Sequence, residues 1–180
     1  MSKLILISGP SGSGKSYLAK YISEQLHIPY FSKDIFKELL FDTVGWSDKE
    51  WSSKLGAAAI QTLYLAIDQE LKNGRSVIAE ANFKPEFNKE PIEKFVELYD
   101  TKVLELHCYA DVKVLKDRAH KRVESEERHP GHMDKELFEK YFDPTLHSPV
   151  NVGEVIKIDT NDFGTVDYSE IVKKVSSFIS

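Results

Sequence analysis

The sequence predicts an α/β protein with a parallel sheet of five strands and helices on both faces, and three observations support this prediction. Short apolar runs alternate with longer segments of helical periodicity along the whole chain, which is typical of parallel sheets. A glycine-rich turn follows the first apolar run and precedes a helical pattern. The chain has 180 residues, of which 41% are hydrophobic and 29% charged, as expected for one globular domain.

The first elements follow from the spacing of apolar residues. Residues 3–8 (KLILIS) include four consecutive apolar side chains, as in a strand that is buried on both faces. A helix is predicted next, because apolar residues recur at every fourth position at Leu18, Ile22 and Leu26. Residues 28–32 predict a short strand that contains Pro29, and residues 35–40 predict a short helix.

A long helix is predicted to begin at Ser47. Ser47 and Glu50 match a capping box, and the two tryptophans at 46 and 51 occupy the positions of a hydrophobic staple. An apolar stripe then continues to Leu71, and Asn73-Gly74 provides the stop signal.

The second half of the chain continues the alternation of strands and helices. Strands are expected at 76–79, 102–109 and 155–158, and helices within 91–99, from about 111, and over 166–179. The helix from about 111 is expected to bury Leu115, Ala119 and Val123. Residues 125–134 (SEERHPGHMD) are polar and contain Pro-Gly, which predicts an exposed loop.

Composition excludes several classes of protein. The longest apolar runs have four or five residues, for example 4–7 and 63–67, so no segment is expected to span a membrane. Cys108 is the single cysteine and cannot form an intramolecular disulfide, so we expect a cytoplasmic protein. The Cys108 side chain is predicted to be a buried structural thiol. The net charge of −5 disfavours a partner such as nucleic acid that is bound by general phosphate neutralisation.

The strongest motif is GPSGSGKS at residues 9–16, a full match to G-x-x-x-x-G-K-[ST]. Glycines at this spacing let backbone N–H groups turn inward around a phosphate, at the positive end of the following helix. Lys15 can then reach the β- and γ-phosphates, and the Ser16 hydroxyl can hold Mg²⁺.

This segment resembles the Walker A motif of P-loop NTPases, and the whole chain resembles the small P-loop kinases. Three further stretches are similar to that group: SKDIFKEL at 32–39, VIAEANF at 77–83, and the arginine-bearing region 118–132. The pattern is most like the zeta-toxin-like and polynucleotide-kinase-like branch. The resemblance implies a three-layer fold with strand order 2-3-1-4-5 and a lid. It also implies donor binding by Gly9, Ser11, Gly12, Ser13, Gly14, Lys15, Ser16, Tyr17, Arg118 and Thr160.

Two carboxylates are candidates for the chemistry. Asp34 follows a strand end, where it can accept the proton of an attacking hydroxyl, or it can instead cap the helix at 35–40. Lys37 either faces the same pocket or is solvated. Glu80 ends a strand and either helps to hold Mg²⁺, directly or through water, or is a surface carboxylate. Asn82 follows Glu80 and is a candidate for substrate contact.

Three arginines are candidates for phosphate contact. Arg118 and Arg122 are four residues apart on one helix, and each either binds phosphate or pairs with Asp117, Glu124 or Glu126. With Arg128, they are expected to act in catalysis by neutralising charge in the transition state. Arg128 lies in the predicted lid, where it can approach the transferring phosphoryl group. His129 and His132 are near it and favour solvation or substrate contact over a metal site.

Together these features predict an ATP- and Mg²⁺-dependent phosphotransferase that moves the γ-phosphate to a hydroxyl of a small polar molecule. Residues 1–180 are expected to form one domain, with the acceptor between a segment at about 34–54 and a lid at about 125–136. A polynucleotide 5′-hydroxyl kinase, a nucleotide-hydrolysing switch with a protein partner, and a non-catalytic nucleotide-binding remnant are the alternatives. The pattern identifies neither the acceptor nor the oligomeric state.

Overall fold

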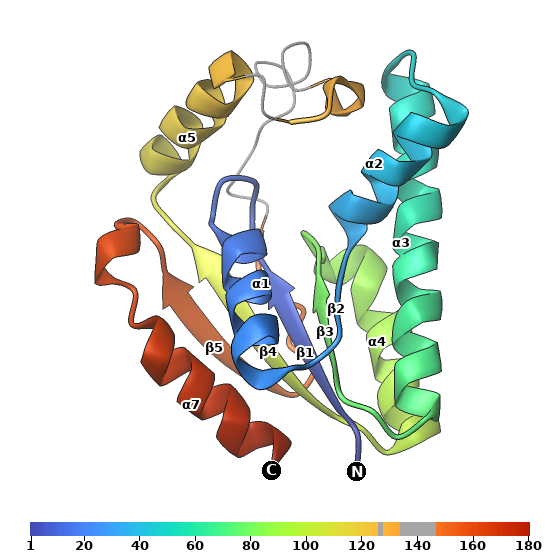
Figure 1. Cartoon of the computed structure of the whole chain (residues 1–180), viewed down its shortest axis with the longest axis vertical. Helices are drawn as coiled ribbons and strands as arrows, with labels where there is room; N and C mark the ends of the chain where they lie inside the picture. Colours follow the sequence, from blue (N-terminus) through green and yellow to red (C-terminus); the bar gives the residue numbers. More distant parts are fainter. Residues whose placement is uncertain (126–127, 134–146) are drawn as a thin grey trace.

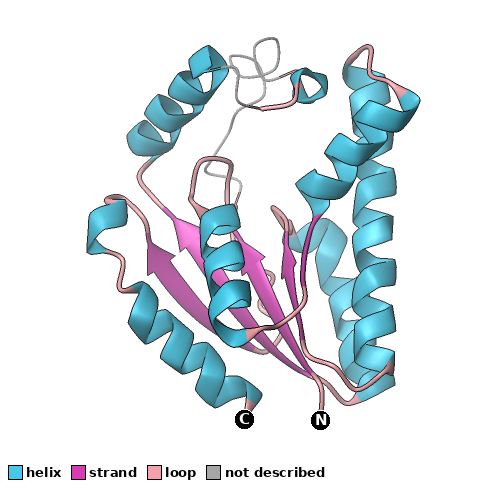
Figure 2. Ribbon diagram, in the orientation of Figure 1, coloured by secondary structure: helices cyan, strands magenta, loops and turns pink. Residues whose placement is uncertain are grey.

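The computed structural model describes residues 1–125, 128–133 and 147–180. Their sheet has five parallel strands in the order β2-β3-β1-β4-β5 (Figures 1 and 2), which confirms the predicted order. The strands are β1 (Lys3–Ser8), β2 (Tyr30–Ser32), β3 (Val77–Glu80), β4 (Lys102–Tyr109) and β5 (Glu154–Asp159). The helices are α1 (Lys15–Leu26), α2 (Lys33–Val44), α3 (Lys49–Lys72), α4 (Pro85–Tyr99), α5 (Val112–Ser125) and α7 (Tyr168–Ile179), with short 3₁₀ helices η1 (Pro130–His132) and η3 (Phe163–Thr165).

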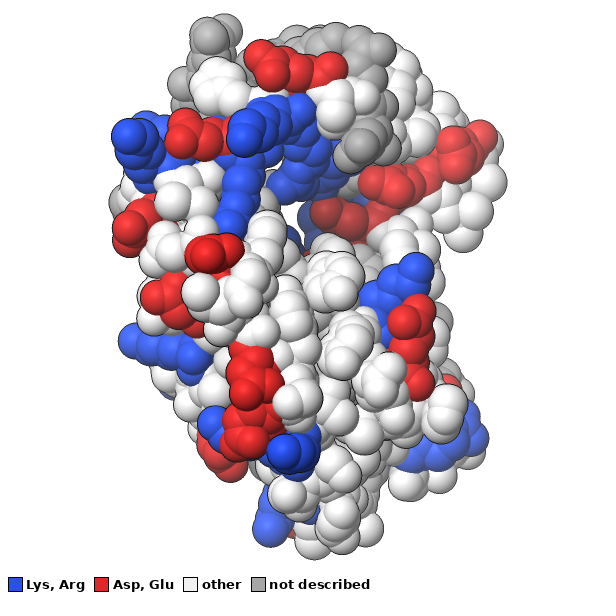
Figure 3. All heavy atoms as spheres, turned by 60° about the vertical axis from the view of Figure 1, so that its left-hand side comes forward, with Lys and Arg blue, Asp and Glu red and all other residues white. Residues whose placement is uncertain are grey.

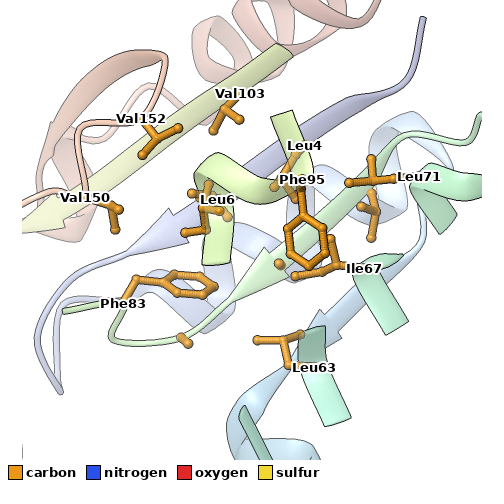
Figure 4. Packing of buried hydrophobic residues seen from close by; sticks show 14 residues of the cluster. Leu4, Leu6, Leu63, Ile67, Leu71, Phe83, Phe95, Val103, Val150 and Val152 are labelled. Carbon is orange, nitrogen blue, oxygen red and sulfur yellow. The ribbon is translucent and has the colours of Figure 1, made fainter. Parts of the chain in front are cut away.

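Alternating side chains of β1 supply both faces of the core. Leu4 and Leu6 pack with apolar residues of α3 and α4 on one face (Figure 4), whereas Ile5 and Ile7 pack with residues of α1 and α7 on the other. All four side chains are fully buried, and each contributes roughly 1.5–3 kcal/mol of transfer free energy. The apolar run therefore forms a central strand because both of its faces are covered.

The helices α3 and α4 do not begin where the sequence predicts, and α2 and α7 begin at Lys33 and Tyr168 instead of residues 35 and 166. The α3 helix begins at Lys49 with Asp48 as its N-cap, whose carboxylate accepts a 2.8 Å hydrogen bond from the Trp51 backbone N–H. The Ser47–Glu50 capping box and the tryptophan staple are therefore wrong by one position, because Ser47 and Asp48 are both good caps. The α4 helix begins at Pro85, which takes the first helical position, so Pro91 lies inside the helix and does not mark its start.

The carboxyl ends of the strands converge on one edge of the sheet. In Figure 1 the β1–α1 turn, α2 and α5 all lie at that upper end of the molecule. Ligands bind at this edge in open α/β sheets, so the candidate site is built here. Within the described residues, no helix has the length and apolar character needed to cross a membrane.

Candidate active site

The turn from β1 to α1, residues 9–16, is the candidate phosphate cradle, and its glycines have the conformations that such a turn requires. Gly9 has φ 135°, and a Cβ there would lie 2.2 Å from the Cys108 carbonyl oxygen, so only glycine fits. Gly14, with φ 77°, is the N-cap of α1 and makes no side-chain capping hydrogen bond. The first turn of α1 contains no acidic residue, which leaves its positive end available to an anion.

Lys15 and Glu80 form a buried ion pair at the base of this cradle. Lys15 Nζ lies 3.7 Å from Glu80 Oε1 and donates a 3.3 Å hydrogen bond to the Pro10 carbonyl. The Glu80 side chain is 2% exposed, so it is not a surface carboxylate. Its Oε2 accepts hydrogen bonds from the hydroxyls of Ser32 (2.6 Å) and Tyr30 (3.4 Å). Glu80 therefore balances the ammonium charge that the cradle contains.

Asp34 is not the N-cap of α2. The helix begins at Lys33, and the Ser32 hydroxyl caps it by accepting the backbone N–H of Asp34 at 3.3 Å. The Asp34 carboxylate accepts a 2.6 Å hydrogen bond from Arg128 and lies 3.6 Å from Lys33 Nζ. Burial alone would raise the pKa of Asp34, but the charges of Arg128, Lys33 and Lys15 outweigh it and hold that pKa well below its usual range. Asp34 is therefore ionised at neutral pH.

Arg118 connects two loops of the site. Its guanidinium donates to the carbonyl of Gly12 (3.3 Å) and to those of Thr160 (2.7 Å) and Asn161 (3.0 Å). The same group lies 3.8 Å from the centre of the Phe163 ring, a cation–π contact. Arg118 therefore binds backbone carbonyls, and not the carboxylates that the sequence analysis gave as alternative partners. The structure thus gives Arg118 an anchoring position between the phosphate cradle and the β5–α7 loop.

A cavity of about 620 Å³ brings part of the predicted site together, although Glu80 and Arg128 are not among its lining residues. It is lined by Gly12, Gly14, Lys15, Ser16, Tyr17, Asp34, Arg118, Lys121, Arg122, Ser125 and Phe163. Figure 3 shows lysine and arginine side chains gathered around a hollow in this part of the surface. The cradle and Asp34 thus open into one positively charged space. Lys121 was not predicted, although its position next to Arg122 on α5 was a usable signal.

Aromatic residues form a second cavity beside the first. It has a volume of about 460 Å³ and is lined by Gly14, Tyr17, Phe163, Gly164 and Tyr168. The Phe163 ring covers Gly14, since a Cβ there would lie 2.5 Å from the ring. Phe163 was missed because the sequence shows only a lone aromatic residue in a polar loop.

Several predicted residues have other partners or remain peripheral. The Thr160 side chain turns inward and donates to the Tyr109 carbonyl at 2.8 Å, so its backbone carbonyl is the group that meets Arg118. The Ser13 hydroxyl is buried without a hydrogen-bond partner among the described residues, and Ser11 is half-buried in the turn. Asn82 is half-buried just beyond β3. Cys108 is fully buried as predicted, and burial raises the pKa of its thiol to about 12.

The described part of the predicted lid is packed against α2 and α3. Residues 126–127 and 134–136 of the prediction lie outside the described residues. In the remaining segment, Gly131 and His132 are buried, so the prediction of a wholly exposed loop is wrong. Lys37 is also buried, and its ammonium donates to Ser52 at 2.9 Å, so it is neither solvated nor a lining residue of the cavity.

A buried polar network supports the cradle from below. Ser8, the last residue of β1, donates a 2.6 Å hydrogen bond to Glu105, and its oxygen lies 2.8 Å from His107 Nδ1. Glu105 also accepts the backbone N–H groups of Val150 (3.0 Å) and Asn151 (3.1 Å). The sequence analysis missed this network, although two polar residues inside the apolar strand KVLELHCY were a signal for it.

Comparisons with known proteins agree with this architecture. A family model described as an AAA domain matches residues 4–142. The crystal structure of a proposed kinase from Chloroflexus aurantiacus J-10-fl is 32% identical over 99% of both chains, with a TM-score of 0.89. Among curated proteins, none matches this sequence.

Two more distant structures share the fold alone. The APS kinase of Mycobacterium tuberculosis, solved with AMPPNP and APS, is 14% identical over 98% of this chain and 96% of its own, with a TM-score of 0.63. The shikimate kinase of Acinetobacter baumannii, solved with shikimate, is 15% identical over 99% and 93%, with a TM-score of 0.51. The chain therefore belongs to the AAA-domain family and has the fold of the small P-loop kinases.

Proposed function

We propose that this protein transfers the γ-phosphoryl group of ATP to a hydroxyl group of a small polar molecule. One observation carries the proposal: the Asp34 carboxylate lines the same 620 Å³ cavity as the phosphate cradle and Arg122. A nucleoside triphosphate with its phosphates in the cradle would thus have an ionised carboxylate in the same cavity. The names of the two distant relatives, an APS kinase and a shikimate kinase, are consistent with a small acceptor.

Each part of the cradle has a role in this reaction. Backbone N–H groups around Gly12 and the start of α1 would hold the β- and γ-phosphates, and Lys15 would leave Glu80 to reach them. The purine would occupy the region of Arg118 and Phe163, where a cation and a ring both stack well on a flat base. Arg122 and Arg128 would neutralise charge that develops on the transferred group.

Mg²⁺ fits the oxygen donors that are present. The Ser16 hydroxyl lines the cavity, and Glu80 is an anionic oxygen donor beside Lys15, which is the ligand type that Mg²⁺ prefers. Ser32 and Tyr30 donate to Oε2 of Glu80, and Lys15 would leave Oε1 when ATP binds. We therefore expect Oε1 to face the ion, directly or through water. When bound, Mg²⁺ would supply positive charge to the β- and γ-phosphate oxygens.

Asp34 would act on the acceptor. The hydroxyl oxygen forms a bond to the γ-phosphorus as the bond from phosphorus to the bridging oxygen breaks, ADP leaves, and the hydroxyl proton passes to Asp34. A carboxylate with a lowered pKa is a weak base, so its main contribution is to orient the hydroxyl. That contribution is sufficient in a loose transition state, where the nucleophile carries little extra charge.

The test compares ADP release in water with ADP release in the presence of a panel of hydroxyl compounds, including 5′-hydroxyl oligonucleotides. We expect stimulation by a small polar compound and a loss of roughly 10²-fold in Asp34→Asn, without loss of ATP binding. This is the lower end of the range for general-base catalysis, because Asp34 is expected mainly to orient the hydroxyl. Titration with Mg²⁺ shows whether Asp34 instead helps to bind the metal. Excess Mg²⁺ would restore the activity of Asp34→Asn if Asp34 bound the metal, but not if it acted on the acceptor hydroxyl. Stimulation by oligonucleotides alone, or hydrolysis that no acceptor accelerates, would favour one of the alternative functions.

A further inference from the structure

The segment 128–133 is fixed to α2 by three charged or polar pairs. Asp34, Glu38 and Asp42 are spaced four residues apart on α2 and therefore lie along one side of the helix. Their partners are Arg128 for Asp34 (2.6 Å), His132 for Glu38 (2.9 Å) and His129 for Asp42 (3.2 Å). Successive turns of α2 thus each hold one residue of the segment.

The surroundings of the two histidines decide which ring nitrogen faces α2. Burial and the nearby Arg128 charge lower the pKa of His132 to about 3, so its Nε2–H donates to the Glu38 carboxylate. In His129, Nδ1 accepts the Gly131 backbone N–H at 3.0 Å, which leaves Nε2–H to donate to Asp42. Both rings therefore present the same nitrogen to α2.

Apolar contacts make the docking specific. The Phe41 ring is stacked on His129, with ring centres 5.0 Å apart, and meets His132 edge-on at 5.3 Å. A Cβ at Gly131 would lie 2.7 Å from the Phe41 ring, so the backbone of the segment touches the ring directly. Phe41 is 2% exposed, and the segment is part of what buries it.

A buried polar chain adds a second attachment. Lys37 donates to the Ser52 hydroxyl at 2.9 Å, and Ser52 donates to the Gly131 carbonyl at 3.0 Å. Lys37 and Ser52 are both buried, where such hydrogen bonds are costly to break. The segment is thus held by α2 and α3 together. This attachment places Arg128 beside the cavity, where its guanidinium pairs with Asp34.

We propose that Glu38 and His132 are positioning residues, whose hydrogen bond fixes the 128–133 segment on α2 and thereby sets Arg128 against Asp34. This proposal rests on the proposed function, because it assigns Glu38 a contribution to phosphoryl transfer that is made through Arg128. Glu38 does not line the cavity with Asp34. Its effect on the rate should therefore vanish when Arg128 is absent.

The experiment compares Glu38→Ala with Glu38→Gln. Both variants remove the charge of Glu38, but glutamine keeps an oxygen that accepts the His132 N–H. The Glu38 side chain is 38% exposed, so its replacement by alanine leaves no closed cavity. We expect Glu38→Ala to lower kcat about 10-fold with less than a ~2-fold change in KM for ATP, and Glu38→Gln to stay near wild type. The double variant Glu38→Ala/Arg128→Ala should be no slower than Arg128→Ala.

A carbon-13 NMR titration of the Asp34 carboxyl gives a readout that needs no acceptor. Loss of the Glu38 charge by itself would lower the pKa of Asp34, whereas displacement of Arg128 would raise it. We expect a rise in Glu38→Ala and not in Glu38→Gln, together with faster amide exchange at Gly131, His132 and Met133.

Additive rate effects in the double variant, or no rise in the pKa of Asp34 in Glu38→Ala, would overturn the positioning role. If the wild-type protein phosphorylates no hydroxyl compound, the proposed function fails. In that case the titration and the amide exchange still show whether the Glu38–His132 bond places Arg128 on Asp34.

Discussion

The Ser32 hydroxyl donates a 2.6 Å hydrogen bond to Glu80 Oε2, and this one contact connects the two halves of the candidate site. The same oxygen accepts the backbone N–H of Asp34 as the N-cap of α2, while Glu80 pairs with Lys15 of the phosphate cradle. A single buried serine at the end of β2 therefore sets both the carboxylate beside the donor phosphates and the carboxylate proposed for the acceptor.

Substitution of Ser32 tests this connection. Ser32→Ala should lower the free energy of unfolding by about 1–2 kcal/mol, because α2 loses its cap and buried Glu80 loses a donor. Phosphoryl transfer should also fall, since both carboxylates are displaced. Urea unfolding measures the first effect. Ser47→Ala is the matched control: Asp48, not Ser47, caps α3, so this variant should be as stable as wild type. Equal stability of Ser32→Ala and Ser47→Ala would contradict the capping role.

The Lys15–Glu80 pair predicts a stability effect that is separate from catalysis. Lys15→Met should abolish transfer and destabilise the protein by on the order of 3 kcal/mol, because Glu80 is left as a buried charge without its cation. Adding Glu80→Gln should restore much of the stability without restoring activity. A phosphoryl-transfer assay measures the first effect, and urea unfolding measures the second. A Lys15→Met protein as stable as wild type would show that Glu80 does not depend on Lys15.

Substitutions of the two α5 arginines, Arg118 and Arg122, should affect different kinetic constants. Arg118 binds three backbone carbonyls and stacks on Phe163, a geometry that lysine cannot reproduce. We expect Arg118→Lys to raise KM for ATP about 10-fold or more with a smaller effect on kcat. Steady-state kinetics with a saturating acceptor measures both constants.

For Arg122 the opposite pattern is expected. If it neutralises charge in the transition state, Arg122→Ala should lower kcat by about 10³-fold, as for other catalytic arginines, with little change in KM. A loss confined to KM would make Arg122 a ground-state ligand of the phosphates.

The parts of the fold that could be predicted are those encoded by neighbouring residues. The run Leu4–Ile7 requires burial on both faces, and the GPSGSGKS motif combines backbone freedom with a lysine and a hydroxyl at fixed spacing. Both signals are local, so the strand order and the phosphate cradle followed once the resemblance was recognised. The N-cap of α3 was missed because Ser47 and Asp48 are adjacent residues with similar capping ability.

The parts that could not be predicted depend on contacts between distant residues. Nothing near residue 128 shows that Arg128 meets Asp34, 94 positions away, or that Gly131 lies on Phe41. Polar residues in a Pro-Gly segment favour solvent on average, yet here three α2 carboxylates and a buried ring provide partners. Burial of His132 is thus a property of the tertiary structure, and composition alone gives the opposite answer.

Two buried histidines and a half-buried one predict that the protein loses stability in mild acid. Burial lowers the pKa of His107, and burial with nearby positive charge lowers that of His132 to about 3 and that of His147 to about 4. Their pKa in the unfolded chain is about 6.5. As the pH falls below that value, the unfolded chain takes up protons that the folded protein does not, so the free energy of unfolding decreases until the folded pKa is reached.

Urea unfolding between pH 7 and pH 5 measures this loss, and each histidine should contribute a slope that approaches about 1.4 kcal/mol per pH unit at the acid end. His132→Gln keeps a side-chain N–H that can reach Glu38 but cannot titrate, so it should remove one such contribution and leave the others. His107→Gln should remove another, and the double variant should show the sum, because the two rings lie in separate hydrogen-bond networks. A free energy of unfolding that stays constant from pH 7 to pH 5 in the wild-type protein would show that these histidines titrate normally in the folded state.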